Sequence, residues 1–263
     1  MSIAGTPRAA HTAPLALRSA TLRTWHEPAA AAARATLVVL VGRGETAEVY
    51  ERFGRRLAAA GFRVVAVGQD HPAPAAVGAL LAGLPAPHVV VGADAGALAA
   101  VRVARAGHAD AVVLAGLPTS AGVQGLAWQA ELDARTTCPA HRRVLGHATR
   151  SSLFADATAI VTADLVRPDD APLDVPLLAL HGGADPVSPV AHAVAAYRVL
   201  GARAVEVVAD GRHDVLNDVD HAAVATTLLT FLDELDGTAP REVARPAPAG
   251  YAVPVAHLIA ASA

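Results

Sequence analysis

The stretch Val89-Val-Val-Gly-Ala-Asp-Ala-Gly-Ala-Leu98 decides the fold of this 263-residue chain. It begins as a continuous run of branched apolar residues, typical of a strand buried on both faces, and ends in a sequence of helical composition. The two parts meet at Gly92-x-Asp94-x-Gly96. A nucleophile on such a sharp turn needs glycine two positions to either side, because a Cβ there would strike the neighbouring strand or helix. The stretch therefore predicts a strand, a nucleophile elbow centred on Asp94, and a helix whose first backbone N–H, that of Ala95, faces developing negative charge.

Six short runs rich in valine and leucine, including the one in this stretch, are continuous in hydrophobicity, and segments of helical length separate most of them. Continuous rather than alternating hydrophobicity is what a strand covered on both faces requires. The alternation of such strands with helices predicts an α/β fold, with a mostly parallel central sheet and helices on both faces. The predicted strands are 37–41, 63–67, 88–91, 111–114, 175–180 and 205–208, and the predicted helices are 47–60, 97–106, 189–200 and 220–235.

The length of the chain predicts one domain over residues 1–263. The rhythm of strands and helices is interrupted at 119–172, which we interpret as a cap insertion over the sheet. We expect an antiparallel pair of strands around 16–25. The tail at 237–263 is rich in proline and alanine, and we expect it to be poorly ordered.

Two late stretches place an acid and a histidine after successive predicted strands. They are Pro176-Leu-Leu-Ala-Leu-His-Gly-Gly-Ala-Asp185 and Gly211-Arg-His213-Asp-Val-Leu-Asn-Asp218. Together with the elbow and the segment 40–64, they resemble the α/β-hydrolase family over residues 36–235, in particular its monoacylglycerol-lipase and lysophospholipase-like branch. The resemblance implies a catalytic triad in the chain order nucleophile, acid, histidine, with Asp185 as the acid and His213 as the base.

The front of the implied pocket departs from the family pattern. Members usually open this loop with His-Gly, whereas this chain reads Val41-Gly-Arg-Gly44. The oxyanion hole that the resemblance implies consists of the backbone N–H groups of Arg43 and Ala95, and a backbone donor needs no particular side chain. The Arg43 guanidinium places a permanent cation at the pocket mouth, which favours an anionic or carbonyl-bearing ligand.

The elbow differs more strongly from the family pattern, because the lipase branch carries serine where this chain has Asp94. Aspartate at this position resembles haloalkane dehalogenases and epoxide hydrolases, in which the carboxylate attacks an sp³ carbon and histidine-activated water cleaves the resulting ester. A carboxylate attacking a carboxylic ester would instead form a mixed anhydride, a poorer intermediate than an acyl-serine. We therefore expect a hydrolase with Asp94 as nucleophile. Its substrate would be small to medium and apolar, and the candidate substrate contacts in the insertion are Trp128, His141 and Arg142.

The groups that assist the electrophile in those families do not stand at their usual places in this sequence. Haloalkane dehalogenases carry tryptophan directly after the nucleophile, where this chain has Ala95. Epoxide hydrolases use tyrosines of the cap, and the tyrosines of this chain lie outside 118–172. The bond class therefore stays open between a carboxylic ester and an alkyl halide or epoxide. Two further alternatives are an inactive member that binds a ligand or partner, and an enzyme in which Asp94 and His213 move protons without a covalent step.

The composition excludes several other functions. All 21 basic residues are arginine, which removes Schiff-base and P-loop lysine chemistry. A net charge of -3 offers no field for gathering nucleic acid or anionic membranes. The single cysteine, Cys138, and the scattered histidines show no metal-ligand spacing, so we expect no metal or other cofactor.

The sequence has no apolar run of about 18 residues and no signal-peptide core near its start. We therefore expect a cytoplasmic protein without stable membrane insertion, whose partner is a small-molecule substrate. The abundance of alanine, arginine, glycine and proline is typical of a GC-rich bacterial genome. The sequence leaves the oligomeric state open.

Overall fold

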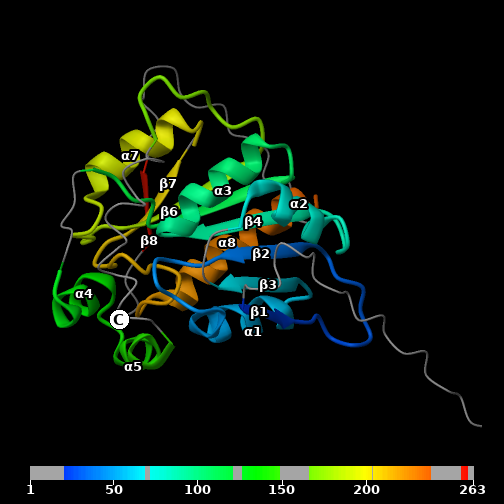
Figure 1. Cartoon of the computed structure of the whole chain (residues 1–263), viewed down its shortest axis with the longest axis horizontal. Helices are drawn as coiled ribbons and strands as arrows, with labels where there is room; N and C mark the ends of the chain where they lie inside the picture. Colours follow the sequence, from blue (N-terminus) through cyan, green and yellow to red (C-terminus); the bar gives the residue numbers. More distant parts are fainter. Residues whose placement is uncertain are drawn as a thin grey trace, which may run out of the picture.

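One sheet runs through the middle of the protein, with helices on its two sides (Figure 1). The computed structural model describes residues 21–68, 72–120, 126–148, 166–202, 204–237 and 256–259. The strands within these residues are β1 (Thr21–Trp25), β2 (Thr36–Leu40), β3 (Arg63–Gly68), β4 (His88–Ala93), β5 (Ala111–Ala115), β6 (Leu177–Gly182), β7 (Val205–Val208) and β8 (Ala256–Ile259). Their order across the sheet is β1-β3-β2-β4-β5-β6-β7-β8. β1 pairs antiparallel with β3, and the other neighbouring pairs are parallel.

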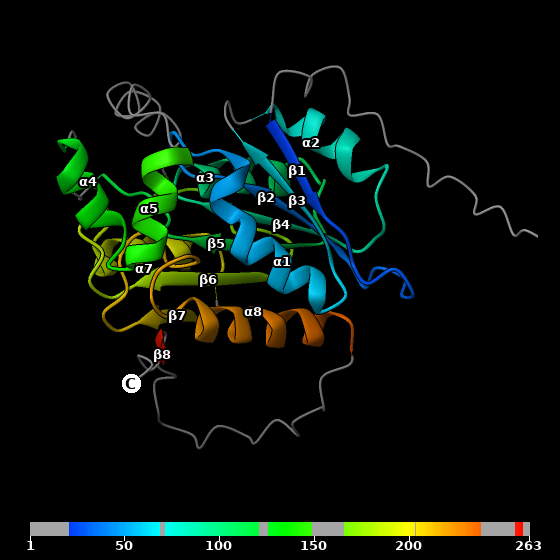
Figure 2. The same cartoon turned by 90° about the horizontal axis from the view of Figure 1, so that it is seen from below.

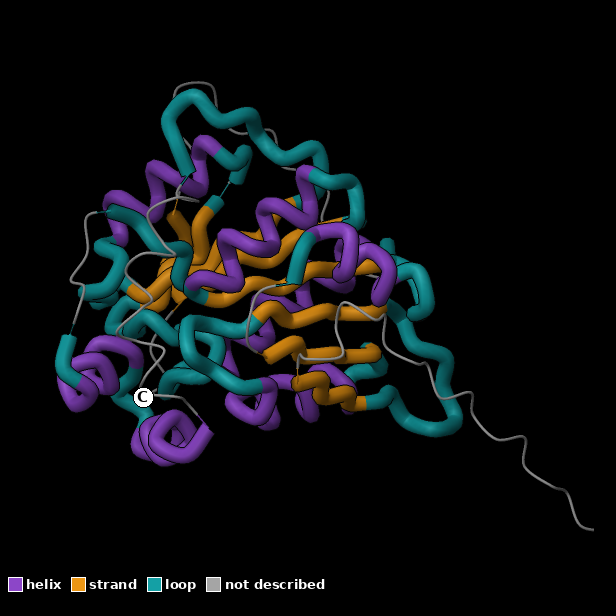
Figure 3. Tube along the Cα trace, in the orientation of Figure 1, coloured by secondary structure: helices purple, strands orange, loops and turns teal. Residues whose placement is uncertain are grey.

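The six strands expected from the sequence are all present (Figure 3). The predicted mostly parallel sheet is confirmed by the pairing of these strands. Every residue of β2, β3 and β5 is buried. Such strands have no solvent face, which is why they are continuous apolar runs in the sequence. Because parallel strands share one direction, the loops that follow β2, β4, β6 and β7 leave the sheet at the same edge, where ligands bind in open α/β sheets.

Helices cover both faces of the sheet (Figure 2). Two apolar clusters lie between sheet and helices, one containing residues of α1 and α8 and the other residues of α2, α3 and α7. Both are mainly aliphatic, as the scarcity of aromatic residues requires. These helices are α1 (Glu51–Ala59), α2 (Pro74–Leu81), α3 (Ala95–Arg105), α7 (Val190–Val199) and α8 (His221–Leu235), and a short 3₁₀ helix, η2 (Ala47–Tyr50), precedes α1.

The structure differs from the sequence-based expectation in three elements. The helix expected at 47–60 is divided into η2 and α1. Helix α2 was not expected, because its eight residues are nearly all apolar and no amphipathic period marks it. Of the antiparallel pair expected around 16–25, residues 16–20 lie outside the described residues, and the antiparallel partner of β1 is the distant strand β3.

The expected cap insertion at 119–172 contributes two described helices, α4 (Trp128–Arg135) and α5 (Pro139–Ala148). They lie close together beside the sheet in both cartoon views (Figure 1). Most of the tail at 237–263 lies outside the described residues, and β8 is the strand described within it. Among the described helices, none is long and apolar enough to cross a membrane.

Candidate active site

The turn between β4 and α3 has the geometry of an elbow. Asp94 has φ 51° and ψ −125°, and it is the one non-glycine residue with positive φ in the described part of the chain. A backbone in such a sparsely populated region is strained by about 1–3 kcal/mol and persists only where its surroundings enforce it. A Cβ on Gly96 would lie 2.0 Å from the carbonyl oxygen of Leu40, and one on Gly92 would lie 2.3 Å from the carbonyl oxygen of Gly96. Both glycines are therefore required by the close approach of α3 to the sheet.

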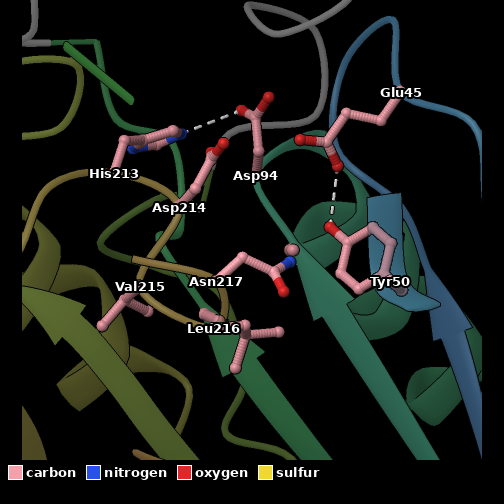
Figure 4. Close-up of a pocket in the computed structure, with 10 residues that line it drawn as sticks. Glu45, Tyr50, Asp94, His213, Asp214, Val215, Leu216 and Asn217 are labelled. Carbon is pink, nitrogen blue, oxygen red and sulfur yellow. Dashed lines mark hydrogen bonds and ion pairs between the residues drawn. The ribbon is translucent and has the colours of Figure 1, made fainter. Parts of the chain in front are cut away.

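Three residues from three different loops meet at this edge of the sheet. Asp94 follows β4, Asp185 follows β6 and His213 follows β7, and all three are buried. Oδ2 of Asp185 lies 2.7 Å from Nδ1 of His213. Nε2 of His213 lies 3.2 Å from Oδ1 of Asp94 (Figure 4), although without the alignment of a hydrogen bond. The three side chains expected from the sequence thus form one continuous chain of contacts.

Asp185 is held firmly in this arrangement. Its Oδ1 accepts hydrogen bonds from the backbone N–H groups of Val187 and Ser188, at 2.8 and 3.0 Å. Its Oδ2 lies near a second histidine as well, His181, whose Nε2 is 3.2 Å away. The carboxylate therefore cannot turn without losing several hydrogen bonds, which fixes the ring of His213 against it.

The Asp94 carboxylate is surrounded by arginine. Nε of Arg43 donates to Oδ2 at 2.7 Å and to Oδ1 at 3.0 Å. Nη2 of Arg135 donates to Oδ2 at 3.1 Å. The backbone N–H of Arg43, expected from the sequence to be an oxyanion donor, binds the same Oδ2 at 3.0 Å. The other expected donor, Ala95, is the first residue of α3 and directly follows Asp94.

Arg135 belongs to a buried network of charges that sequence reasoning missed. Its guanidinium also binds Glu45 and Glu131, each at 2.9 Å. Glu45 in turn accepts hydrogen bonds from the backbone N–H of Gly42 at 2.9 Å and from the hydroxyl of Tyr50 at 2.8 Å. In the sequence, Glu131 and Arg135 form an i,i+4 pair, which is ordinarily a surface feature of a helix. The sequence shows the spacing of this pair but does not reveal that the pair is buried.

These contacts determine the protonation of the site. Burial acts to raise the pKa of Asp94, but the charges of Arg43, His213 and Arg135 outweigh it and hold the pKa well below its usual range. Burial acts to lower the pKa of His213, but Asp185 and Asp94 raise it to about 10. The pKa of Asp185 is lowered, because the two histidines outweigh the effect of burial. At neutral pH, Asp94 and Asp185 are therefore anions and His213 is a cation.

A small cavity of about 10 Å³ lies beside the three residues. Asp94 and His213 line it on one side and Asn217, Tyr50 and Glu45 on another (Figure 4). This volume holds roughly one water molecule, which would find several polar partners in the walls. The space next to Asp94 thus suits a water molecule.

The three candidate substrate contacts in the insertion are not among the residues that line this cavity. Trp128 packs against an apolar cluster of the core. His141 is buried, with Nε2 3.0 Å from Oδ2 of Asp214, and Arg142 binds Asp133. These side chains are engaged by the protein itself.

Comparisons with solved structures identify the fold. An esterase, RhEst1 from Rhodococcus sp. ECU1013, superposes with a TM-score of 0.66 at 20% identity, over 81% of this chain and 94% of its own. A monoacylglycerol lipase from Paleococcus ferrophilus gives a TM-score of 0.61 at 14% identity, over 82% and 98% of the two chains. An enol-lactonase from Burkholderia xenovorans LB400 gives 0.59 at 17% identity, over 82% and 98%. The chain therefore has the α/β-hydrolase fold expected from its sequence. No protein-family model matches the sequence, and no curated protein matches it significantly.

Proposed function

We propose that this protein is a hydrolase that uses Asp94 as a covalent nucleophile against an sp³ carbon of a small to medium apolar substrate. The observation that carries the proposal is the continuous contact from Asp94 through His213 to Asp185 at the ends of three strands. Structural neighbours that act on esters or lactones support hydrolysis as the reaction class. The identity of the nucleophile supports an alkyl halide or epoxide rather than a carboxylic ester. The cytoplasmic location predicted from the sequence stays a prediction.

The ionised state of Asp94 suits this first step. Asp94 is ionised and needs no base to become a nucleophile, whereas a serine would need a neutral histidine. Attack by Oδ1 requires the Arg43 side chain to turn away from that oxygen. Oδ1 then forms a bond to the substrate carbon while the bond from that carbon to the halogen or epoxide oxygen breaks. The electron pair stays with the departing halide or with the opened oxygen. Oδ2 stays in place as the carbonyl oxygen of the new ester.

The same charges explain how His213 becomes a base for the second step. Esterification removes the negative charge of Asp94, one of the two charges that raise the pKa of His213, so this pKa falls. The proton of His213 then passes to the alkoxide of an opened epoxide or, with an alkyl halide, to solvent. A water molecule in the cavity can then attack Cγ of Asp94 while Nε2 of His213 takes one of its protons. The tetrahedral oxyanion develops on Oδ2, where the backbone N–H of Arg43 stabilises it. Collapse of the intermediate breaks the bond between Cγ and the ester oxygen, and the leaving alkoxide takes the proton from His213 and departs as the alcohol. One oxygen of the water stays in Asp94.

Isotope incorporation into Asp94 tests this proposal. Excess protein is allowed one turnover in ¹⁸O-water with 1-bromobutane, 1,2-epoxybutane or p-nitrophenyl butyrate, and the peptide containing Asp94 is analysed by mass spectrometry. We expect ¹⁸O in Asp94 with the bromide or the epoxide, and neither product nor label in the Asp94→Asn variant. Product formation with an unlabelled Asp94 would contradict the covalent route and favour acid–base catalysis by Asp94 and His213.

One observation favours a second candidate, a non-catalytic protein that binds a ligand or partner. Both oxygens of Asp94 are engaged by Arg43, and the adjoining cavity holds about one water. In this alternative, the ions of the site stabilise the fold and do not react. A broad panel of halides, epoxides and esters that gives no turnover, together with a thermal-shift response to a member of the panel, would support it.

A further inference from the structure

Arg135 is unusual in being an arginine without exposed surface. Its side chain is the largest of those that are fully buried in the described part of the chain. An ionised group is removed from water only at a large free-energy cost, which good geometry and several partners must offset. The position of Arg135 at the end of α4 therefore calls for an explanation beyond packing.

The guanidinium joins helix α4 to three other parts of the site. On its own helix it binds Glu131, and on the loop after β2 it binds Glu45 and the carbonyl oxygen of Arg43, the latter at 3.3 Å. On the elbow it donates to Oδ2 of Asp94 at 3.1 Å. The third part is the loop after β7, where Oδ1 of Asp214 lies 3.6 Å from Nη1.

The backbone of α4 is fixed to the loop that carries His213 as well. The backbone N–H of His213 donates to the carbonyl oxygen of Ala134 at 3.3 Å, and the N–H of Asp214 donates to that of Arg135 at 2.9 Å. The last residues of α4 thus contact both the nucleophile and the histidine loop. Movement of α4 would break all of these contacts, so this helix is a fixed wall of the site.

The contact of Arg135 with Oδ2 of Asp94 bears on the reaction itself. Oδ2 is the oxygen that already accepts the backbone N–H of Arg43, and it becomes the oxyanion when water attacks the ester on Asp94. A cationic donor held at this oxygen in a buried site stabilises the developing charge more strongly than a neutral one. In the resting protein the same contact stabilises the carboxylate and so makes it a weaker nucleophile.

We infer that Arg135 is a further catalytic residue, a charged oxyanion donor that the inserted helix α4 supplies to Oδ2 of Asp94. The inference rests on the proposed function. It follows that Arg135 opposes the alkylation of Asp94 and promotes the hydrolysis of the resulting ester. A residue with a purely structural role would not affect the two steps in opposite directions.

The test compares Arg135→Gln and Arg135→Lys with wild type and with Arg63→Gln. Arg63 is a matched control, since it is a buried arginine that binds Glu27 and stands at the start of β3. Each protein is incubated with 1-bromobutane, and intact mass spectrometry follows the butyl adduct on Asp94. With Arg135→Gln we expect the adduct to accumulate, because its hydrolysis slows by about 10²–10³-fold, the usual loss for one oxyanion donor. In Arg135→Lys the rate of adduct hydrolysis should lie between those of wild type and Arg135→Gln. This variant replaces Arg135→Gln in the test if Arg135→Gln does not fold.

A measurement without substrate separates this inference from the proposed function. The ¹³C signal of the Asp94 carboxyl group is identified by its loss in Asp94→Asn and followed from neutral pH down to acid unfolding. We expect protonation at higher pH in Arg135→Gln than in wild type, by about 1–3 pH units, since a neighbouring cation shifts an aspartate by this amount. Equal titration in the two proteins, or an adduct that turns over at the wild-type rate, overturns the role of Arg135. The expected NMR shift without any adduct in wild type or variant contradicts the proposed function and, with it, the catalytic part of the inference.

Discussion

At the scale of single residues, an aspartate at the elbow makes different groups ready to react than a serine would. A serine elbow has a neutral nucleophile and depends on a neutral histidine. Here the elbow carries a carboxylate that is ionised at neutral pH, and the neighbouring histidine is a cation because two carboxylates raise its pKa to about 10. Arg43 adds to this difference, since its Nε donates hydrogen bonds to both oxygens of Asp94.

Truncation of Arg43 therefore has a definite expected result. Arg43→Ala keeps the backbone N–H that binds Oδ2 but removes the guanidinium from both oxygens of Asp94. A hydrogen bond to a charged group contributes about 1.5–3 kcal/mol, so alkylation of Asp94 by 1-bromobutane should accelerate about tenfold or more. The measurement is the rate of adduct formation by intact mass. Arg142→Ala, which removes an arginine bound to Asp133 and not to Asp94, is the control. A rate that matches the control would show that Arg43 does not restrain Asp94.

The raised pKa of His213 also predicts a pH dependence of stability. The ordinary pKa is 6.5 and the folded value is about 10, so the folded protein holds a proton that the unfolded chain loses between these two values. This contribution to the free energy of unfolding is complete below about pH 6.5 and decreases as the pH rises toward 10, with a slope of up to about 1.4 kcal/mol per pH unit. Urea unfolding between pH 6 and pH 9 should show the decrease in wild type and a flatter profile in His213→Gln. Parallel profiles would mean that His213 is neutral in the folded protein.

At the scale of elements, the sequence predicted the parts that depend on burial and close approach. Buried strands are continuous apolar runs, and the sharp elbow requires glycines, so the sheet and the turn at Asp94 were both visible in the sequence. Helix α4 was not, because the insertion has no apolar period that aligns it with the sheet. The role of Arg135 was hidden for the same reason, since the partners that surround its guanidinium come from loops distant in the sequence.

The packing of α3 against the sheet gives a prediction with a matched control. In Gly96→Ala, the added Cβ would lie 2.0 Å from the backbone oxygen of Leu40, so α3 or β2 must move. We expect a loss of about 1–3 kcal/mol or more in the free energy of unfolding. For Gly146, in α5, an added Cβ would meet no heavy atom within 4 Å among the described residues outside its own helix backbone. Gly146→Ala should therefore raise stability by about 0.5–1 kcal/mol through helix propensity. Urea denaturation measures both. Equal small effects in the two variants would show that the elbow tolerates a side chain.

At the scale of the whole molecule, the fold determines where the site residues meet, whereas the charges around the elbow determine which chemistry they support. The α/β-hydrolase fold brings the ends of β4, β6 and β7 together whichever residue occupies the elbow, so Asp185 and His213 meet the same position in a serine enzyme and here. What differs is the charge around that position. Arg43, Arg135 and His213 are arranged about an anion, and replacement of that anion changes the protonation of the whole site.

Asp94→Ser tests this separation directly. Serine removes one of the two charges that raise the pKa of His213, so the histidine becomes neutral nearer to pH 7 and can act as a base. The backbone N–H of Arg43, released from the carboxylate, becomes free to bind an oxyanion. We therefore expect Asp94→Ser to hydrolyse p-nitrophenyl acetate with a burst of acyl-enzyme, while Asp94→Ala and the double variant Asp94→Ser/His213→Gln do not. The rate should rise with pH as His213 loses its proton. A folded Asp94→Ser protein no faster than Asp94→Ala would mean that Arg43 and Arg135, left without their anion, close the pocket, so that the fold alone does not supply a working site.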